Sequence, residues 1–425
     1  MRVRTGLVAL VSFVLAAVAA CTPSTTGRSG SPSSSSAAGH QGMSMAVPTP
    51  AAKGSPAQVR AQFEQLLGQH TFLAVRLMRS VVSAAPDRQA AEASLQHNTE
   101  ALSQLVAAAY GKDQGDLFTQ LWQRHITNLL SYANGVATHD ESAKQAARAA
   151  LVADGDAYGS WLAGASQGRT RASDAVRVQV EELMNQLDAY AARDYDQAYR
   201  IQREAFEHMF TAGATLAKAS VTPELGAGLD TPPVRLRSAF AMLLGEHMEL
   251  IVEAQRATFA GSPEFKAAAA QVNANTTALT QALAAIVGPR KAAEFQSAWA
   301  DHVEGLIAYT AAVAGRDQAG KAAAQKKLNT VVVTLAVYFA GVVRDQGAVV
   351  PLTGAITMHD RHLTEQADAY AAKDYGRAHQ LELEGDQQML GVANTLVDGI
   401  QRTVRPGLPV GGSQTGGGGT ARRSR

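Results

Sequence analysis

Cysteine is almost absent from this chain: Cys21 is the single cysteine among 425 residues, so no intramolecular disulfide can form. Net charge is almost absent as well, because 38 Lys and Arg residues oppose 37 Asp and Glu residues. Such a balance gives no field that would draw the chain to nucleic acid, so no nucleic-acid partner is expected. Aromatic residues make up only 6% of the chain. Alternating apolar and polar residues, the pattern of half-buried strands, are missing over any useful length.

The N-terminus has the pattern of a secretory signal. Arg2 and Arg4 give it a positive start, and an apolar run over residues 7–20 follows. This run is too short for a membrane span, which needs about 20 apolar residues. It ends in Val-Ala-Ala followed by Cys21 and resembles a bacterial lipobox, whose Cys becomes the lipid-bearing mature N-terminus. Residues 1–20 are therefore expected to be a lipoprotein signal peptide. Lipidation of Cys21 would anchor the protein on the extracytoplasmic face of the cell membrane.

Two terminal segments have a composition that does not fold. Residues 21–57 are rich in Ser, Gly, Thr and Pro and are predicted to form a disordered tether. Residues 406–425 are predicted to form a disordered, Gly-rich tail. The tether contains His40, Met43 and Met45, soft ligands that suit Cu(I), although such a short tract is also common without a metal.

The remaining chain carries one pattern of helices twice. The stretch around Trp122 and His125 returns around Trp299 and His302, an offset of 177 residues. Apolar residues recur at helical spacing in both copies. We predict an all-α protein built from two tandem repeats of an antiparallel bundle of about six helices each. The first repeat is expected at residues 58–220 and the second at residues 234–405. A Pro- and Gly-rich linker is expected between them at residues 221–233.

Local signals predict where several helices begin. Asp194 is expected to cap the sixth helix of the first repeat. In the second repeat Pro263, Pro289 and Pro351 are expected at the first positions of helices. In the last two helices the offset grows to 180 residues, since the segment 188–195 matches 368–375.

Histidines at equivalent positions of the two copies are the main indication of a site. His70 matches His247, and His125 matches His302; each has apolar residues three or four positions away, so each is expected to face the core. A buried imidazole needs either hydrogen-bond partners or a metal ion.

The fifth and sixth helices add further candidates. Histidines and carboxylates that converge inside a helical bundle can hold iron, zinc or copper, of which we favour copper or iron. The candidate ligands are His70, His125, Glu204 and His208 in the first copy and His247, His302, His359 and Glu384 in the second. The third and fourth ligands differ between the copies. Neither the Glu-x-x-His of di-iron proteins nor the His-x-x-x-Glu of haemerythrins is in place, so the analogy to ferritin-like and haemerythrin-like bundles concerns the fold alone.

The alternative to a metal is structural. Each histidine could be hydrogen-bonded in the core to Asn98, Asn275, a tyrosine or a backbone carbonyl. Trp122 and Trp299, next to the histidines, could stack on a ligand but are more typical of core packing.

The order of four motifs resembles a group of exported, often lipid-anchored bacterial helical proteins. The motifs are Leu-Leu-Gly-x-His, Asn-Thr-x-x-Leu, Leu-Trp-x-x-His, and Asp-Ala-Tyr-Ala-Ala-x-Asp-Tyr-x-x-Ala, and the resemblance covers about residues 59–220 and 234–402. It implies a helical fold and export but no particular activity. The group's pattern has a His on the fifth helix, matched by His359, and a His-Met pair on the sixth, matched by His208 and Met209. Gln179 and Gln388 depart from it.

Three functions remain open from the sequence. The first, which we favour, is a non-enzymatic, lipid-anchored binding module of the cell envelope with a protein or ligand as partner. The second is the binding or handling of copper or iron through the inward-facing His and Glu residues. The third is an envelope enzyme that uses a buried His as acid or base, and no thiol other than Cys21 offers a nucleophile.

Overall fold

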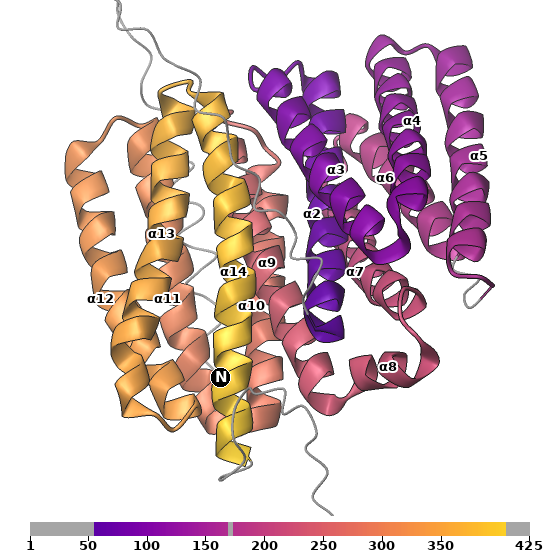
Figure 1. Ribbon diagram of the computed structural model, residues 1–425. Coiled ribbons are helices and arrows are strands. Elements are labelled where there is room, and N and C mark those ends of the chain that lie inside the picture. Colours follow the sequence, from indigo (N-terminus) through magenta and orange to yellow (C-terminus); the bar gives the residue numbers. More distant parts are fainter. Residues whose placement is uncertain (1–54, 169–172, 405–425) are drawn as a thin grey trace, which may run out of the picture.

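The computed structural model describes residues 55–168 and 173–404, and within these ranges every regular element is a helix (Figure 1). The predicted all-α fold is thus confirmed for the part of the chain that is described. The expected signal peptide, the expected lipidation site at Cys21, nearly all of the expected tether and the whole of the expected tail lie outside it. None of the described helices is both long enough and apolar enough to span a membrane.

Twelve long helices fall into two sets of six among the described residues. The first set is α2 (Pro56–Ser83), α3 (Arg88–Tyr110), α4 (Lys112–Thr138), α5 (Glu141–Ala165), α6 (Ser173–Ala191) and α7 (Tyr195–Ala219). The second set is α9 (Pro232–Phe259), α10 (Phe265–Val287), α11 (Pro289–Ala314), α12 (Gln318–Val342), α13 (Val349–Ala371) and α14 (Tyr375–Val404). This arrangement is compatible with two tandem copies of one bundle.

Two of the four predicted helix starts agree with the structure, and two differ. Pro289 does stand at the first position of α11, and the Asp194 carboxylate caps α7 by accepting from the Gln197 amide. Pro263 instead precedes α10, which begins at Phe265, and α13 begins two residues before Pro351.

The segment between the two sets of helices is folded. It contains α8 (Pro223–Ala227) and the 3₁₀ turn η1 (Gly228–Asp230). Leu229 of η1 is buried, and the Arg60 guanidinium donates to the Leu229 carbonyl. This connection is therefore held against α2.

The two sets lie side by side, and their first helices, α2 and α9, pack against each other between them (Figure 1). Helix α2 also contacts α3, α4, α6 and α7, while α9 also contacts α10, α11, α13 and α14. Both helices are consequently covered on all sides: residues 67–81 of α2 and 243–255 of α9 are buried without interruption. The apolar spacing had predicted one buried face for each.

All-round burial forces polar residues of the central helices to find partners inside the protein. Arg76 of α2, only 1% exposed, lies among three carboxylates. Its Nη2 donates to Glu249 Oε2 at 3.0 Å and to Glu253 Oε1 at 2.8 Å, and its Nη1 donates to Glu382 of α14. These ion pairs join the first set of helices to the second.

A close contact between α2 and α7 depends on a glycine. A Cβ built on Gly213 of α7 would lie 2.5 Å from the backbone nitrogen of Glu64 in α2. Backbone atoms cannot move aside as a flexible side chain can, so only glycine permits this approach.

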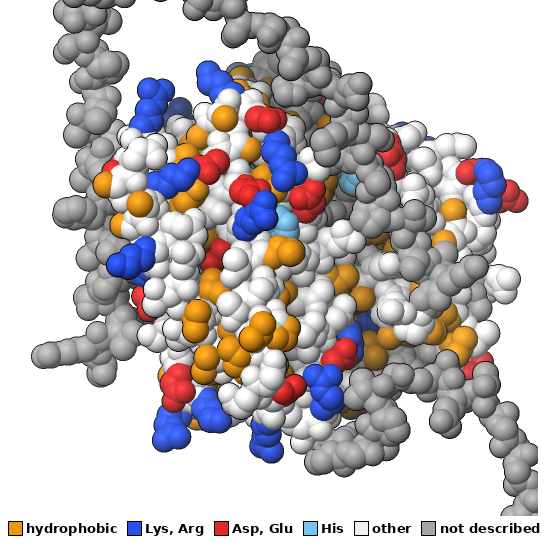
Figure 2. All heavy atoms as spheres, turned by 60° about the vertical axis from the view of Figure 1, so that its left-hand side comes forward, with side chains coloured by type: hydrophobic (Ala, Val, Ile, Leu, Met, Phe, Trp, Pro, Cys, Tyr) orange, Lys and Arg blue, Asp and Glu red, His pale blue; other side chains and the backbone are white. Residues whose placement is uncertain are grey.

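The face of the second set shown in Figure 2 has no region of a single charge sign. Acidic and basic side chains lie close to one another, and hydrophobic side chains are scattered between them in small groups. This face thus agrees with the even charge balance of the sequence.

Replacing Arg76 by Met should lower the free energy of unfolding by about 3–5 kcal/mol, because it leaves the carboxylates of Glu249, Glu253 and Glu382 buried without their cation. Denaturant unfolding followed by circular dichroism measures the change. The control is Arg361→Met, whose side chain is 70% exposed and whose loss should have no measurable effect. Equal stability of the two variants would contradict a structural role for the buried ion pairs.

Gly213→Ala should lower the free energy of unfolding by about 1–3 kcal/mol, because the new methyl group meets the α2 backbone. Gly354→Ala in α13 is the matched control, since a Cβ there has no neighbour within 4 Å. That substitution should stabilise the protein by about 0.5–1 kcal/mol through helix propensity. The same unfolding measurement decides; opposite signs are expected, and a Gly213→Ala protein as stable as the wild type would refute the close approach.

Candidate metal centre

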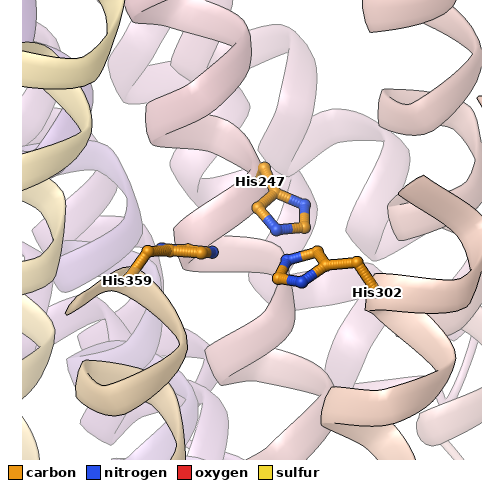
Figure 3. Close-up of side chains that lie close together, drawn as sticks. All are labelled: His247, His302 and His359. Carbon is orange, nitrogen blue, oxygen red and sulfur yellow. The ribbon is translucent and has the colours of Figure 1, made fainter. Parts of the chain in front are cut away.

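Three histidines from three helices meet in the second set. His247 comes from α9, His302 from α11 and His359 from α13, and Figure 3 shows their rings turned toward a common point. One nitrogen from each ring can be chosen so that all lie within 4.8 Å of one another. The ring centroids form a nearly equilateral triangle, with separations of 5.5, 5.4 and 5.4 Å. Among the described residues this is the group of metal-ligating side chains that is close enough to share an ion.

The three imidazoles are buried and unpaired. His247 and His302 are fully buried, and His359 is 2% exposed. None of their six ring nitrogens has a hydrogen-bond partner among the described residues. A neutral imidazole must still place one donor and one acceptor, and leaving buried polar atoms unpaired costs about 1–3 kcal/mol each. A cluster of this kind is costly unless something binds to it.

Burial keeps these rings neutral. Desolvation lowers the pKa of His302 to about 3. Burial, followed by the neighbouring imidazoles, lowers the pKa of His247 and His359 well below the usual value. Neutral imidazoles have free lone pairs, which is the state that coordinates a metal ion.

A buried carboxyl group accompanies the cluster. Asp360 follows His359 on α13, and its Oδ1 lies 3.3 Å from His302 Nδ1. The two atoms are close but not aligned as a hydrogen bond, and burial raises the pKa of Asp360 well above its usual value. A carboxylate beside the second nitrogen of a metal-bound imidazole is a common outer partner, because it orients the ring. Sequence analysis missed Asp360, whose only sequence signal is its place next to His359.

An aromatic ring closes one side of the cluster. The Trp299 ring lies 4.7 Å from the His247 ring and 5.0 Å from the His302 ring, measured between centroids. Trp299 is itself buried. The tryptophan therefore packs directly on the histidines and shields them from water.

The first set of helices contains a partial version of this centre. His70 of α2 and His125 of α4 have ring centroids 5.9 Å apart, are fully buried and lack partners, as their counterparts do. Burial lowers the pKa of His125 to about 4. On α6 the position equivalent to His359 is Gln179, also fully buried, whose amide oxygen and nitrogen both lack partners. Two imidazoles and an amide make a weaker donor set for a transition metal than three imidazoles.

Glu204, His208 and Glu384 do not join the histidines, contrary to the prediction. Glu204 is exposed. The His208 side chain is 54% exposed, and its Nδ1 lies 2.6 Å from a carboxylate oxygen of Glu182. The Glu384 side chain is 42% exposed and accepts from Gln380. These side chains point away from the core because α7 and α14 turn other faces inward.

The structural alternative predicted that the histidines are hydrogen-bonded to Asn98 and Asn275, and this prediction is also wrong. Asn98 donates to the Leu66 carbonyl and to Gln69, and Asn275 donates to the Leu243 carbonyl and to Glu246. These asparagines tie neighbouring helices together, and neither bonds to an imidazole.

One serine has the spacing of a nucleophile elbow, a motif that was wrongly taken to be missing from the sequence. The stretch 164–168 reads Gly-x-Ser-x-Gly around Ser166. An elbow requires a strand before the serine and a helix after it. Ser166 instead follows the last residue of α5, and its hydroxyl bonds back to the Ala163 carbonyl. This stretch is a helix end.

Comparison of the chain with protein-family models, with curated proteins and with solved structures finds no significant match. The function has to be argued from the residues of the site.

Proposed function

We propose that this protein binds a transition-metal ion of the copper, iron and zinc group through His247, His302 and His359. The observation that carries the proposal is the convergence of three buried imidazoles, none of whose nitrogens has a hydrogen-bond partner among the described residues. A structural role alone would leave those nitrogens uncompensated, whereas one metal ion would satisfy one nitrogen of each ring.

The donor set fits such an ion. Imidazole suits zinc, copper and iron, and bond lengths to zinc are about 2.0–2.1 Å, which places ligand nitrogens roughly 3.3 Å apart. The present spread of up to 4.8 Å is within reach of small side-chain rotations. Three protein ligands also leave a position for a further ligand.

The surroundings favour binding over catalysis. The imidazoles are buried, Trp299 covers them, and they sit between helices that pack closely. A substrate would have to displace this packing, whereas a small ion would not. A metal ion would thus be the specific ligand of the binding module that the sequence predicts.

The N-terminal sequence supports a place for this activity. A lipobox-like end to the signal at Cys21 is compatible with a lipid-anchored protein on the outer face of the cell membrane, held at the end of a tether. The proposed partners are accordingly the membrane, through the lipid, and a metal ion.

Metal content after loading tests the site. Full-length protein loaded separately with copper, iron or zinc and then desalted should retain about one ion per chain, measured by plasma mass spectrometry. His359→Gln reproduces the residue of the first set and should reduce the retained metal at least about tenfold, by analogy with the loss of a single ligand. Gln179→His supplies the missing imidazole to the first set and should raise the content toward two ions.

His208→Gln is the control, because it removes an exposed histidine and should leave the metal content unchanged. The proposal fails if the wild type retains none of the three metals, or if His359→Gln retains as much as the wild type. A folding defect in His359→Gln would not obscure the result, since Gln179→His tests for a gain.

Cys21→Ser should abolish lipidation, because serine lacks the thiol that forms the thioether. Wild-type protein expressed in a bacterial host should remain with the membrane fraction and incorporate labelled fatty acid, whereas the variant should do neither. Labelling of the variant equal to that of the wild type would refute the lipid anchor.

A further inference from the structure

A cavity of about 560 Å³ lies where the two sets of helices meet, apart from the histidine cluster. Its walls come from the C-terminal ends of α2 and α9, from the turn after α6 and from the turn between α9 and α10. The floor includes the buried side chains of Arg76, Arg79 and Glu253, while Pro86 and Pro263 on the rim are exposed. The volume is in the range typical of small-molecule sites, about 300–1,000 Å³.

Arg79 is the exceptional residue of this cavity. It is only 5% exposed, yet neither Nη1 nor Nη2 has a hydrogen-bond partner among the described residues. Its Nε donates to Gln186, and the closest carboxylate oxygen, on Glu253, is 3.8 Å from Nη1. The guanidinium lies over the rings of Tyr190 and Tyr199, 4.9 and 4.4 Å from their centroids. The tyrosine rings hold the guanidinium in place, and its Nη1 and Nη2 groups remain without an acceptor in the described part of the chain.

The equivalent arginine of the second repeat shows that these two Nη groups can bind a carboxylate. Arg256 follows Arg79 by the offset of 177 residues, and both of its Nη atoms donate to the two oxygens of Asp87. The residue equivalent to Asp87 is Glu264, which also lines the cavity. No hydrogen bond or ion pair within 4 Å joins Glu264 to Arg79 in the described structure. A carboxylate of the protein therefore accepts from both Nη atoms of Arg256, whereas none among the described residues accepts from those of Arg79.

Three of the arginines that line the cavity differ in how closely carboxylates of the protein pair with them. Arg76 is held by the carboxylates of Glu249, Glu253 and Glu382, and Arg256 is held by Asp87. Among the described residues Arg79 has only the Glu253 carboxylate, 3.8 Å from its Nη1, and shares it with Arg76. A monoanion fits beside Arg79 better than a phosphate dianion, because Glu253 and Glu264 would repel a second negative charge.

We propose that the cavity binds a small organic monocarboxylate. Its carboxylate would accept hydrogen bonds from Nη1 and Nη2 of Arg79, as the Asp87 carboxylate accepts from those of Arg256. An arginine and a carboxylate match in planar, bidentate geometry. Tyr190, Tyr195 and Tyr370 line the same cavity and offer apolar surface and hydroxyl groups to the body of the ligand. This site is independent of the metal centre in the residues that form it.

Binding of para-fluorobenzoate to the full-length protein, followed by fluorine NMR, tests the proposal. The wild type should show saturable binding at millimolar or lower concentrations. Arg79→Lys keeps the charge but loses the fork, so it should weaken binding at least about tenfold. Ala260→Trp, at an exposed position on the wall, should block the cavity while leaving Arg79 intact.

Glu264→Gln provides a change in the opposite direction. It removes a negative charge next to the bound carboxylate and should tighten binding, which a purely structural role of Glu264 would not predict. Exposed Arg361→Met is the control and should bind as the wild type does.

Inorganic phosphate, titrated in parallel, distinguishes the two kinds of anion. The carboxylate assignment is overturned if phosphate binds through Arg79 and fluorobenzoate does not. The site itself is overturned if the wild type binds neither anion, or if Arg79→Lys and Ala260→Trp both bind fluorobenzoate as strongly as the wild type.

Discussion

The burial of two central helices on all sides is the constraint on which the rest of this structure depends. Helices α2 and α9 carry charged and polar residues along with leucines, and neither has a face left for water. Every such residue must be compensated within the protein or by something that it binds. Arg76 is compensated in this way across the junction of the two sets of helices, since its guanidinium donates to three carboxylates.

The histidines of α2, α4, α9, α11 and α13 and Arg79 of α2 are among the buried residues that lack this compensation. The imidazoles have neutral rings without partners, and Arg79 has two donors without acceptors. Both lie where side chains from several helices converge, and both are held rigidly, the histidines by tryptophan and the arginine by tyrosines. A rigid but unsatisfied polar group is prepared for a ligand, since little ordering remains to be done on binding. The proposed metal centre and the proposed carboxylate site thus share one physical cause.

The local features of the fold could be predicted from the sequence, and the contacts between helices could not. Asp194 and Pro289 act within one helical turn of where they stand, so they indicated helix starts correctly. His70 and His247 were correctly expected in the core because apolar neighbours surround them along the helix. Glu204 was misplaced because its helix turns another face inward, and helical spacing alone does not show which polar residues are covered. Asp360 was missed for the same reason: its proximity to His302 depends on how α11 and α13 cross.

Comparison of the two repeats carries information that neither repeat carries alone. Equivalent positions hold Arg76 and Glu253, and these residues pair with each other, so divergence there joins the two sets of helices. At Gln179 and His359 the divergence instead leaves one copy without the third imidazole of the cluster. At Asp87 and Glu264 the divergence gives Arg256 a carboxylate that accepts from both of its Nη atoms, while the Nη atoms of Arg79 form no hydrogen bond within the described residues. A duplicated fold keeps the same backbone positions, so a change of side chain in one copy can create or remove a site without disturbing the packing. Differences between equivalent buried positions are therefore the places where function is to be sought in this protein.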